Sequence, residues 1–156
     1  MPVIHHSAIC VGDVEASLVF WRDGLGFEVL MDTRFDGDWP TLLRAPTTSL
    51  RAVFLGDPAD AGAGIVELVD LGSVPVGAQP ADGPAASGLL LLSVMADVDD
   101  TLERLRSLGL GGEPRRVAVG GIAMAVVVDP DGVLVELVDT AATRNLQRLT
   151  HHDRDT

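Results

Sequence analysis

Two glutamates occupy equivalent places in a repeated sequence, and carboxylates so placed can bind metals or move protons. The sequence Val-Glu-Leu-Val-Asp stands at residues 66–70 and again at residues 135–139, which places Glu67 and Glu136 inside apolar runs. Side chains alternate across a strand, so each glutamate shares a strand face with apolar neighbours. Because burying an unpaired carboxylate is costly, each must either line a cleft or lie on a solvent face opposite a buried one. Alternation permits both arrangements, and we favour the cleft.

The surroundings of both glutamates repeat as well. An apolar run ends in Asp57-Pro58 before the first copy and in Asp129-Pro130 before the second. Because Asp-Pro and nearby glycines are typical of turns, each copy is interpreted as a strand, a turn and a second strand. An internal repeat of this length predicts two modules built on one plan.

Each copy also begins with a strand followed by a helix. In the first copy, residues 3–11 are the expected strand, Asp13 suits a helix N-cap, and apolar residues recur at helical spacing as far as Gly24. In the second copy, residues 89–95 and Asp97 repeat that plan. Further strands of the first copy are expected at residues 27–34, 42–45 and 50–55.

The fold class expected from this pattern is α+β. Since neither copy could cover both faces of its sheet alone, we expect two βαβββ modules to form one curved, eight-stranded mixed sheet around a cleft, with the helices outside. The single domain is expected to cover residues 1–140, as modules 1–72 and 88–140 joined by a linker, 73–87, that is rich in Pro, Gly and Ala. Residues 141–156 are expected to be a C-terminal tail.

Composition and charge restrict the partners. With 156 residues, 47% of them hydrophobic, the chain can bury one proper core. The formal net charge of −12 repels phosphate backbones and anionic lipids, so neither nucleic acid nor a membrane is expected as a partner. The chain has a single cysteine, Cys10, and shows neither a basic start nor a long apolar stretch, so we expect no intrachain disulfide and a cytoplasmic location.

The two ends of the repeat resemble the vicinal oxygen chelate superfamily, which includes glyoxalases, bleomycin resistance proteins and extradiol dioxygenases. The resemblance is carried by residues 6–13 (His-Ser-Ala-Ile-Cys-Val-Gly-Asp), 20–21 (Phe-Trp), 25–27 (Leu-Gly-Phe), 129–132 (Asp-Pro-Asp-Gly) and 134–137 (Leu-Val-Glu-Leu). It covers residues 3–140 and favours the expected fold. Because one scaffold in this superfamily supports many reactions, function has to be argued from the site.

The resemblance implies a divalent metal site. In similar metal-dependent members, a His on the first strand and a Glu on the last strand of each module converge on one metal, which here implies His6, Glu67 and Glu136. The fourth position falls on Leu89 or Leu90, depending on where the count starts, and neither side chain can bind a metal. One imidazole and two carboxylates suit Mn, Ni, Zn or Mg. Non-haem iron oxygenases typically use two His and one carboxylate, so dioxygenase chemistry is less favoured.

Other side chains are candidates for lining the cleft. Trp39, in a loop bounded by Gly and Pro, and Arg51 are the expected substrate-binding residues, although a solvated surface charge is the ordinary state of such an arginine. His5 is expected to point away from its neighbour His6, and Cys10 to be a buried, inert thiol.

The resemblance finally implies a function. We expect a metal-dependent lyase or isomerase that acts on a small carbonyl compound, with Glu136 moving a proton next to a metal-bound pair of oxygens. The alternative is a non-catalytic protein that binds or sequesters a small molecule, as bleomycin resistance proteins do, and the missing second histidine favours it. An enzyme that uses the cleft without a metal is a third possibility. The resemblance also implies a homodimer.

Overall fold

The computed structural model describes residues 2–72, 74 and 88–140, and the chain divides into two compact units, Met1–Ala78 and Gln79–Thr156. The division falls inside the predicted linker, most of which lies outside the described residues, as does the predicted tail 141–156. Each unit contains one four-stranded mixed sheet, which confirms the α+β class and the two βαβββ modules. That the two sheets form one curved sheet stays a prediction.

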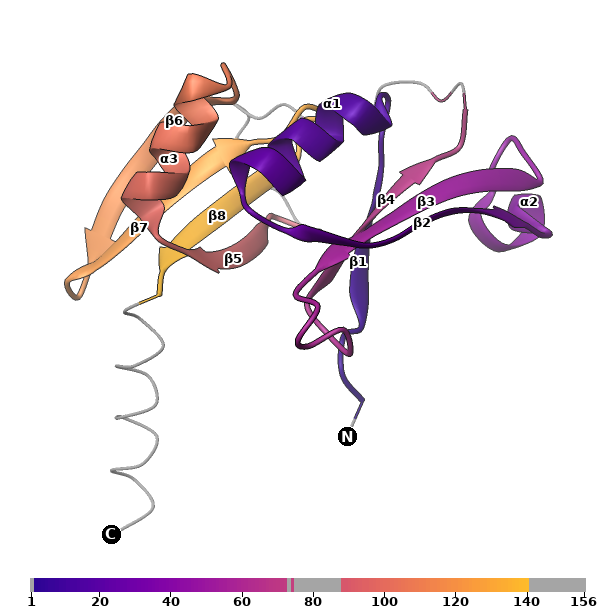
Figure 1. Cartoon of the computed structure of the whole chain (residues 1–156), viewed down its shortest axis with the longest axis horizontal. Helices are drawn as coiled ribbons and strands as arrows, with labels where there is room; N and C mark the ends of the chain where they lie inside the picture. The colour runs from indigo at the N-terminus through magenta and orange to yellow at the C-terminus, as the bar shows by residue number, and fades with distance from the viewer. Residues whose placement is uncertain (1, 73, 75–87, 141–156) are drawn as a thin grey trace, which may run out of the picture. The chain divides into compact units, whose positions relative to one another are not determined.

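The first unit orders its strands β1-β4-β3-β2, with β1 parallel to β4 and the other neighbours antiparallel (Figure 1). The strands are β1 (His6–Cys10), β2 (Glu28–Asp36), β3 (Ser49–Gly56) and β4 (Ile65–Asp70). A helix, α1 (Val14–Leu18), continues as the π-helical segment η1 (Val19–Gly24) and returns the chain to the far edge of the sheet. Asp13 caps α1 as predicted, because its carboxylate accepts hydrogen bonds from the amides of Glu15 and Ala16 at 2.9 and 3.2 Å.

The second unit repeats this plan with the order β5-β8-β7-β6 and with β5 parallel to β8. Its elements are β5 (Leu92–Ala96), α3 (Val98–Ser107), β6 (Gly111–Val119), β7 (Ile122–Val128) and β8 (Leu134–Asp139). Asp97 caps α3 as predicted, since its carboxylate accepts a hydrogen bond from the amide of Asp100 at 3.0 Å. Each glutamate of the repeat therefore stands on the second strand from one edge of its sheet, opposite a parallel edge strand.

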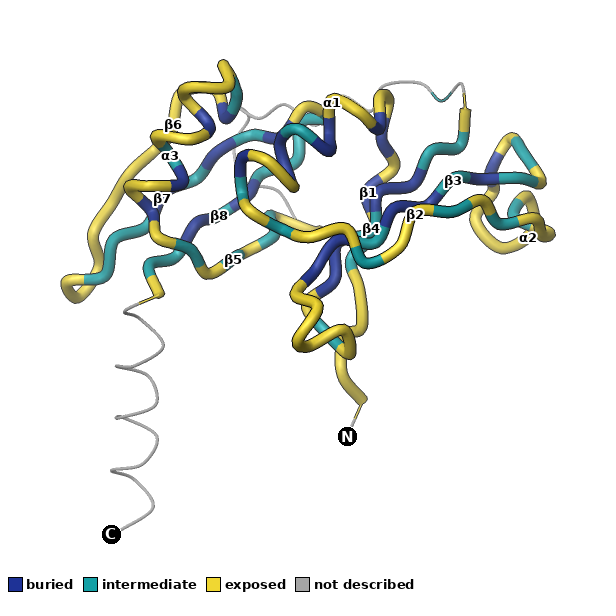
Figure 2. Tube along the Cα trace, in the orientation of Figure 1, coloured by how far each residue is buried: buried dark blue, intermediate teal, exposed yellow. Residues whose placement is uncertain are grey.

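The main core of each unit lies on the sheet face that its helix covers. In the first unit α1 contacts β4, and Trp21 and Leu68 are fully buried. In the second unit α3 contacts β6, β7 and β8, Leu137 is fully buried and Leu105 is almost completely buried. Each such side chain contributes about 1.5–3 kcal/mol by leaving water. Figure 2 shows the buried stretches along these strands. Because Leu68 and Leu137 directly follow the two glutamates, alternation places both carboxylates on the face opposite the helix.

One predicted strand is wrong. Residues 42–45 were expected to be extended, but the chain forms a short helix, α2 (Trp39–Leu43), between β2 and β3. The Asp38 carboxylate accepts a hydrogen bond from the amide of Thr41 at 3.3 Å, and a proline stands in the first turn. Both features favour a helix start, and they outweigh the apolar run that suggested a strand.

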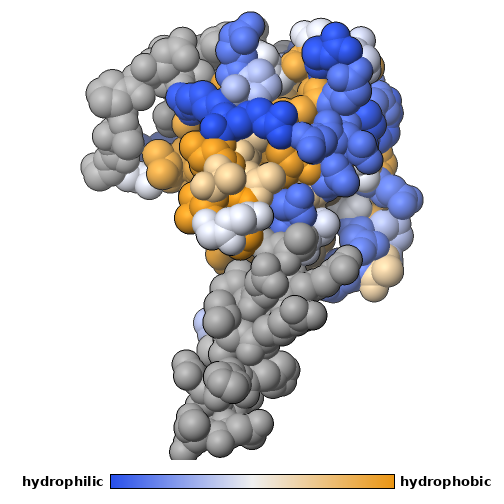
Figure 3. Space-filling model, turned by 90° about the vertical axis from the view of Figure 1, so that its left-hand side faces the viewer, coloured by the Kyte–Doolittle hydropathy of each residue, from blue (hydrophilic) through white to orange (hydrophobic). Residues whose placement is uncertain are grey.

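The second unit leaves a row of apolar side chains open on the face that carries Glu136. Met95, Val138, Met124 and Val117 lie side by side across its four strands, and the outer two are 50% and 60% exposed. Figure 3, which views the left-hand side of Figure 1, shows hydrophobic side chains gathered below a band of hydrophilic ones.

Within the described ranges, no helix is long and apolar enough to cross a membrane.

Candidate functional site

Glu67 places a carboxylate on an apolar face of the first sheet. In the register of the sheet it stands between Ala8 on β1 and Phe54 on β3, and its side chain is only 14% exposed. On the same face, Val69 belongs to a second small apolar cluster with Leu50. Glu67 is thus a carboxylate held among apolar neighbours, and that it lines a cleft stays a prediction.

His6 is the polar partner of Glu67. Its Nε2 atom lies 3.3 Å from Glu67 Oε2, and its ring meets the ring of Phe54 edge to face, with centroids 5.9 Å apart. Burial raises the pKa of the Glu67 carboxyl above its ordinary value, and the smaller effects of His6 and His5 act in the opposite direction. The pair therefore combines an imidazole with a carboxylate. The two histidines offset only part of the pKa increase that burial causes at Glu67.

His5 does not point away from His6, so that prediction was wrong. The two Nδ1 atoms lie 2.9 Å apart, and the rings are nearly perpendicular. The physical reason is that β1 begins at His6, so strand alternation does not govern the residue before it. A ligating histidine is commonly oriented by a partner on its other ring nitrogen, and His5 stands at that nitrogen of His6.

Glu136 occupies the equivalent place in the second unit but has a different partner. It stands between Ser93 on β5 and Val126 on β7, and the Ser93 hydroxyl donates a hydrogen bond of 2.7 Å to Glu136 Oε2. In the first unit, the residue that corresponds to Ser93 is Ala8, which pairs with Glu67 and has no hydroxyl. No local sequence pattern points to Ser93, and the register of the parallel strand pair is the signal that finds it.

The register also corrects the fourth ligand position of the family pattern. His6 stands two residues before the partner of Glu67, and two residues before the partner of Glu136 is Leu91, not Leu89 or Leu90. Counting from the helix caps failed because Asp13 lies five positions beyond Ala8, whereas Asp97 lies four positions beyond Ser93. Leu91 cannot bind a metal either, so the consequence for the donor set is unchanged.

The remaining predicted residues fall in different places. Trp39 packs against the cluster of Leu50 and Val69 on the Glu67 face, and its indole nitrogen donates to the Phe35 carbonyl at 2.9 Å. Arg51 lies on the other face, because it follows Leu50 on β3, and its guanidinium donates to Asp32 at 2.7 and 2.9 Å and to Glu15 at 3.0 Å. The structure therefore places Trp39 on the sheet face of Glu67, whereas Arg51 lies on the opposite face and pairs with two carboxylates there.

Cys10 is exposed, so the expectation of a buried thiol was wrong. It shares a strand face with His6 and ends β1 at the edge of its sheet, where one side of the strand has no neighbour within the unit. Ile9, its neighbour on the same edge strand, is buried on the other face, so the exposure of Cys10 comes from the strand face that it occupies.

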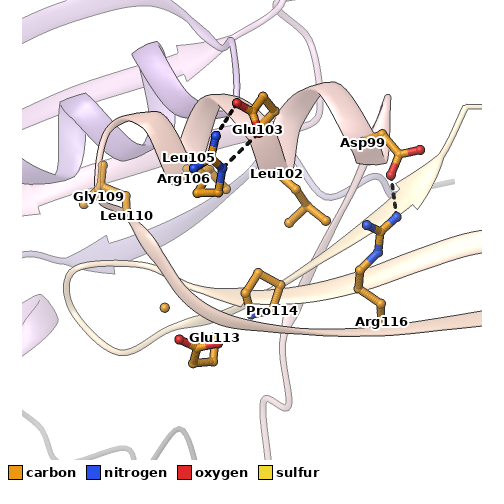
Figure 4. A pocket seen from close by; sticks show the side chains of 11 residues that line it. Asp99, Leu102, Glu103, Leu105, Arg106, Gly109, Leu110, Glu113, Pro114 and Arg116 are labelled. Atoms are coloured by element: carbon orange, nitrogen blue, oxygen red, sulfur yellow. Dashed lines mark hydrogen bonds and ion pairs between the residues drawn. The ribbon is translucent and has the colours of Figure 1, made fainter.

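A separate hollow of about 760 Å³ lies in the second unit between α3 and β6. Figure 4 shows two ion pairs at its lining: Glu103 pairs with Arg106 at 2.6 Å, and Asp99 pairs with Arg116. None of the predicted site residues lines it. Since α3 covers the face opposite Glu136, this hollow is distinct from the sheet face that carries the carboxylate.

In chemical terms the first unit offers two metal donors, the imidazole of His6 and the carboxylate of Glu67. Among the described residues, no group of three or more His, Cys, Asp or Glu side chains is close enough to hold a metal ion. The predicted donor set of His6, Glu67 and Glu136 therefore stays a prediction, supported by the pairing within the first unit.

Comparisons with known proteins agree on one group. The family model described as the Glyoxalase/Bleomycin resistance protein/Dioxygenase superfamily matches residues 3–137. The chain is 34% identical over 148 residues to the lactoylglutathione lyase-like protein terB of Aspergillus terreus, covering 86% of this chain and 74% of the relative. It is 27% identical over 142 residues to a probable lactoylglutathione lyase of Synechocystis, covering 90% and 97% of the two chains.

A solved structure of the trypanothione-dependent glyoxalase I of Leishmania major shares the fold. Its TM-score is 0.66, and the match covers 99% of both chains. At 20% sequence identity this likeness supports the fold alone.

Proposed function

This chain belongs to the Glyoxalase/Bleomycin resistance protein/Dioxygenase superfamily, and on that premise we propose that it is a glyoxalase-like lyase acting on a small carbonyl compound. The observation that carries the proposal is the contact of 3.3 Å between His6 and Glu67 on an apolar sheet face. The names of both curated relatives refer to lactoylglutathione, which makes this thioester the first substrate to test. An isomerase reaction on a similar carbonyl compound is the closest variant of this proposal.

The donor set fits a divalent metal ion. Glu67 is a partly desolvated carboxylate, and His6 turns Nε2 toward it, so a cation there would compensate the buried negative charge. We propose His6, Glu67 and Glu136 as the residues that hold Mn, Ni, Zn or Mg. When bound, such a cation would supply Lewis acidity toward a carbonyl oxygen.

Glu136 is the proposed proton carrier. Its carboxylate stands on an open sheet face beside Val126, and Oε1 makes no hydrogen bond or ion pair in the described part of the chain. A carboxylate so placed can take a proton from a carbon next to a carbonyl and return it to a neighbouring atom. General base catalysis of this kind accelerates a reaction by about 10²–10⁴-fold.

A non-catalytic binding protein is the second candidate, and one observation favours it. Leu91 stands where the first unit has His6, so the second unit has no imidazole beside its glutamate at that position. The open apolar row that includes Met95 and Val117 could hold an aromatic ligand, and the net charge of −12 would attract a cationic one.

The test combines turnover with metal binding. Chelator-treated wild type, Glu136→Gln and His6→Ala would be titrated with Mn²⁺, Ni²⁺ and Zn²⁺ by calorimetry and assayed with lactoylglutathione. We expect Glu136→Gln to lower kcat by about 10²–10⁴-fold and His6→Ala to weaken metal binding by at least about tenfold. If wild type turns nothing over and binds no cation more tightly than both variants, the lyase proposal fails and the binding protein becomes the better account.

A further inference from the structure

The hydrogen bond between Ser93 and Glu136 is a feature that the proposed function does not use. The serine hydroxyl lies 2.7 Å from Glu136 Oε2, and the two residues are direct partners in the register of β5 and β8. Because they come from two strands that are 43 positions apart in the chain, the fold of the whole unit brings them together. The contact is therefore built into the sheet.

The first unit shows what the same position looks like without a hydroxyl. Ala8 stands opposite Glu67, and the carboxylate there is met by His6 instead. The two glutamates of the repeat thus have different partners, an imidazole at one and a hydroxyl at the other. Serine is not among the residues that strands favour, so strand propensity does not account for this residue.

A hydroxyl has a specific advantage as the partner of a base. It donates one hydrogen bond and brings no positive charge, whereas Arg or Lys would pair with the carboxylate and compete for its proton-accepting role. In the part of the chain that the structure describes, Glu136 makes no ion pair. One oxygen is thereby held, while the second oxygen is left without a partner in the described part of the chain.

Orientation is what the hydrogen bond can add. A glutamate side chain on an open sheet face has several rotamers, and only some of them present an oxygen to a bound substrate. Small misplacements of a reacting group cost large factors in rate. We propose that Ser93 is a positioning residue for Glu136, which holds Oε2 by its hydroxyl and leaves Oε1 as the oxygen that meets the substrate. The inference rests on the proposed role of Glu136 as the base.

A matched pair of variants separates the hydroxyl from the shape of the side chain. Ser93→Thr keeps the hydroxyl, and Ser93→Val has the shape of threonine without it; both residues suit a strand. In metal-free protein, NMR couplings would give the rotamer populations of Glu136. We expect one dominant rotamer in wild type and Ser93→Thr, and an averaged population in Ser93→Val. Equal melting temperatures of the two variants would exclude a general loss of structure.

The same variants would be titrated with Mn²⁺. We expect Ser93→Val to bind it about 10–100-fold more weakly than Ser93→Thr, which is the effect of losing a hydrogen bond that orients a metal ligand. Equal Glu136 rotamer populations in the two variants would overturn the positioning role, whatever the protein does with metal. If the populations differ but wild type binds no Mn²⁺, the positioning role stands and the metal part of the proposed function fails.

Discussion

Glu67 and Glu136 stand at the same place in two copies of one module, yet their surroundings differ. Both lie on the second strand of a four-stranded sheet, on the face away from the helix. Glu67 contacts an imidazole and its pKa is raised by burial, while Glu136 accepts a hydrogen bond from a hydroxyl. The repeated scaffold fixes where each carboxylate stands, and single residues on the neighbouring edge strand decide its chemistry.

This difference teaches that the two halves of the repeat need not share one role. A carboxylate beside an imidazole suits metal binding, whereas one held by a neutral donor with a free oxygen suits proton transfer. The core beneath the two carboxylates is by contrast the same. Leu68 and Leu137, the residues that follow the glutamates, are both fully buried.

The largest expected effect tests whether the two modules are equivalent in stability. Leu68→Ala and Leu137→Ala each remove a fully buried side chain at the same place in the repeat, so each should lower the free energy of unfolding by about 2–5 kcal/mol. Urea denaturation followed by circular dichroism measures both. A large loss in one variant with almost none in the other would show that the two cores are not equivalent.

A smaller effect is expected from making the second unit like the first. Leu91→His places an imidazole two positions before Ser93, as His6 lies two positions before Ala8, so the second unit should gain its own His–Glu pair and bind Ni²⁺ about 10–100-fold more tightly than wild type. Calorimetry measures the change. The matched control is Leu89→His, which adds the same side chain two residues farther from the start of β5 and should leave the affinity unchanged; equal gains in both variants would refute the register assignment.

The smallest effect concerns the pH dependence of stability. Because the pKa of Glu67 is raised in the folded state, ionising it costs folding free energy, and the cost appears as the pH rises above the ordinary pKa of a glutamate. Metal-free Glu67→Gln should therefore be more stable than wild type at pH 7, by less than about 1 kcal/mol because solvent screens the charge, and should lose this advantage at low pH.

Urea denaturation between pH 4 and pH 7 measures that difference. Glu28→Gln, which removes an exposed carboxyl from β2, controls for the change in net charge. A Glu67→Gln variant that is less stable than wild type at neutral pH would mean that His6 stabilises the ionised carboxylate more than burial penalises it.

Much of the fold follows from the sequence because its signals are local and repeated. Asp13 and Asp97 predict two helix starts that the structure confirms by their side-chain hydrogen bonds. The two Val-Glu-Leu-Val-Asp segments predict strands whose alternation places both glutamates on corresponding faces. Residues 42–45 were misjudged because an apolar run can belong to a strand or a short helix, and the Asp38 cap decided it.

The site was predicted less completely, for a different reason. The pairing of His6 with Glu67 agrees with the family pattern, but Ser93 and Leu91 gain meaning only from the register between strands distant in sequence. Counting along the chain includes the residues between the first strand and the helix cap, and the two modules differ by one residue in that segment. The engagement of Arg51 by Asp32 and Glu15 likewise depends on contacts that no local pattern encodes.

The parallel pairing of first and last strands has a consequence for how the protein matures. In each unit the strand that begins the module, β1 or β5, pairs with the strand that ends it, β4 or β8. Closing so long a loop is entropically costly, and contacts between distant segments form slowly during folding. During synthesis on a ribosome, His6 emerges well before Glu67, so the two residues cannot make contact until nearly the whole module has been synthesised. The residue pairs assigned here to chemistry are thus among the last native contacts each module can make, so a prematurely truncated module would lack its pair.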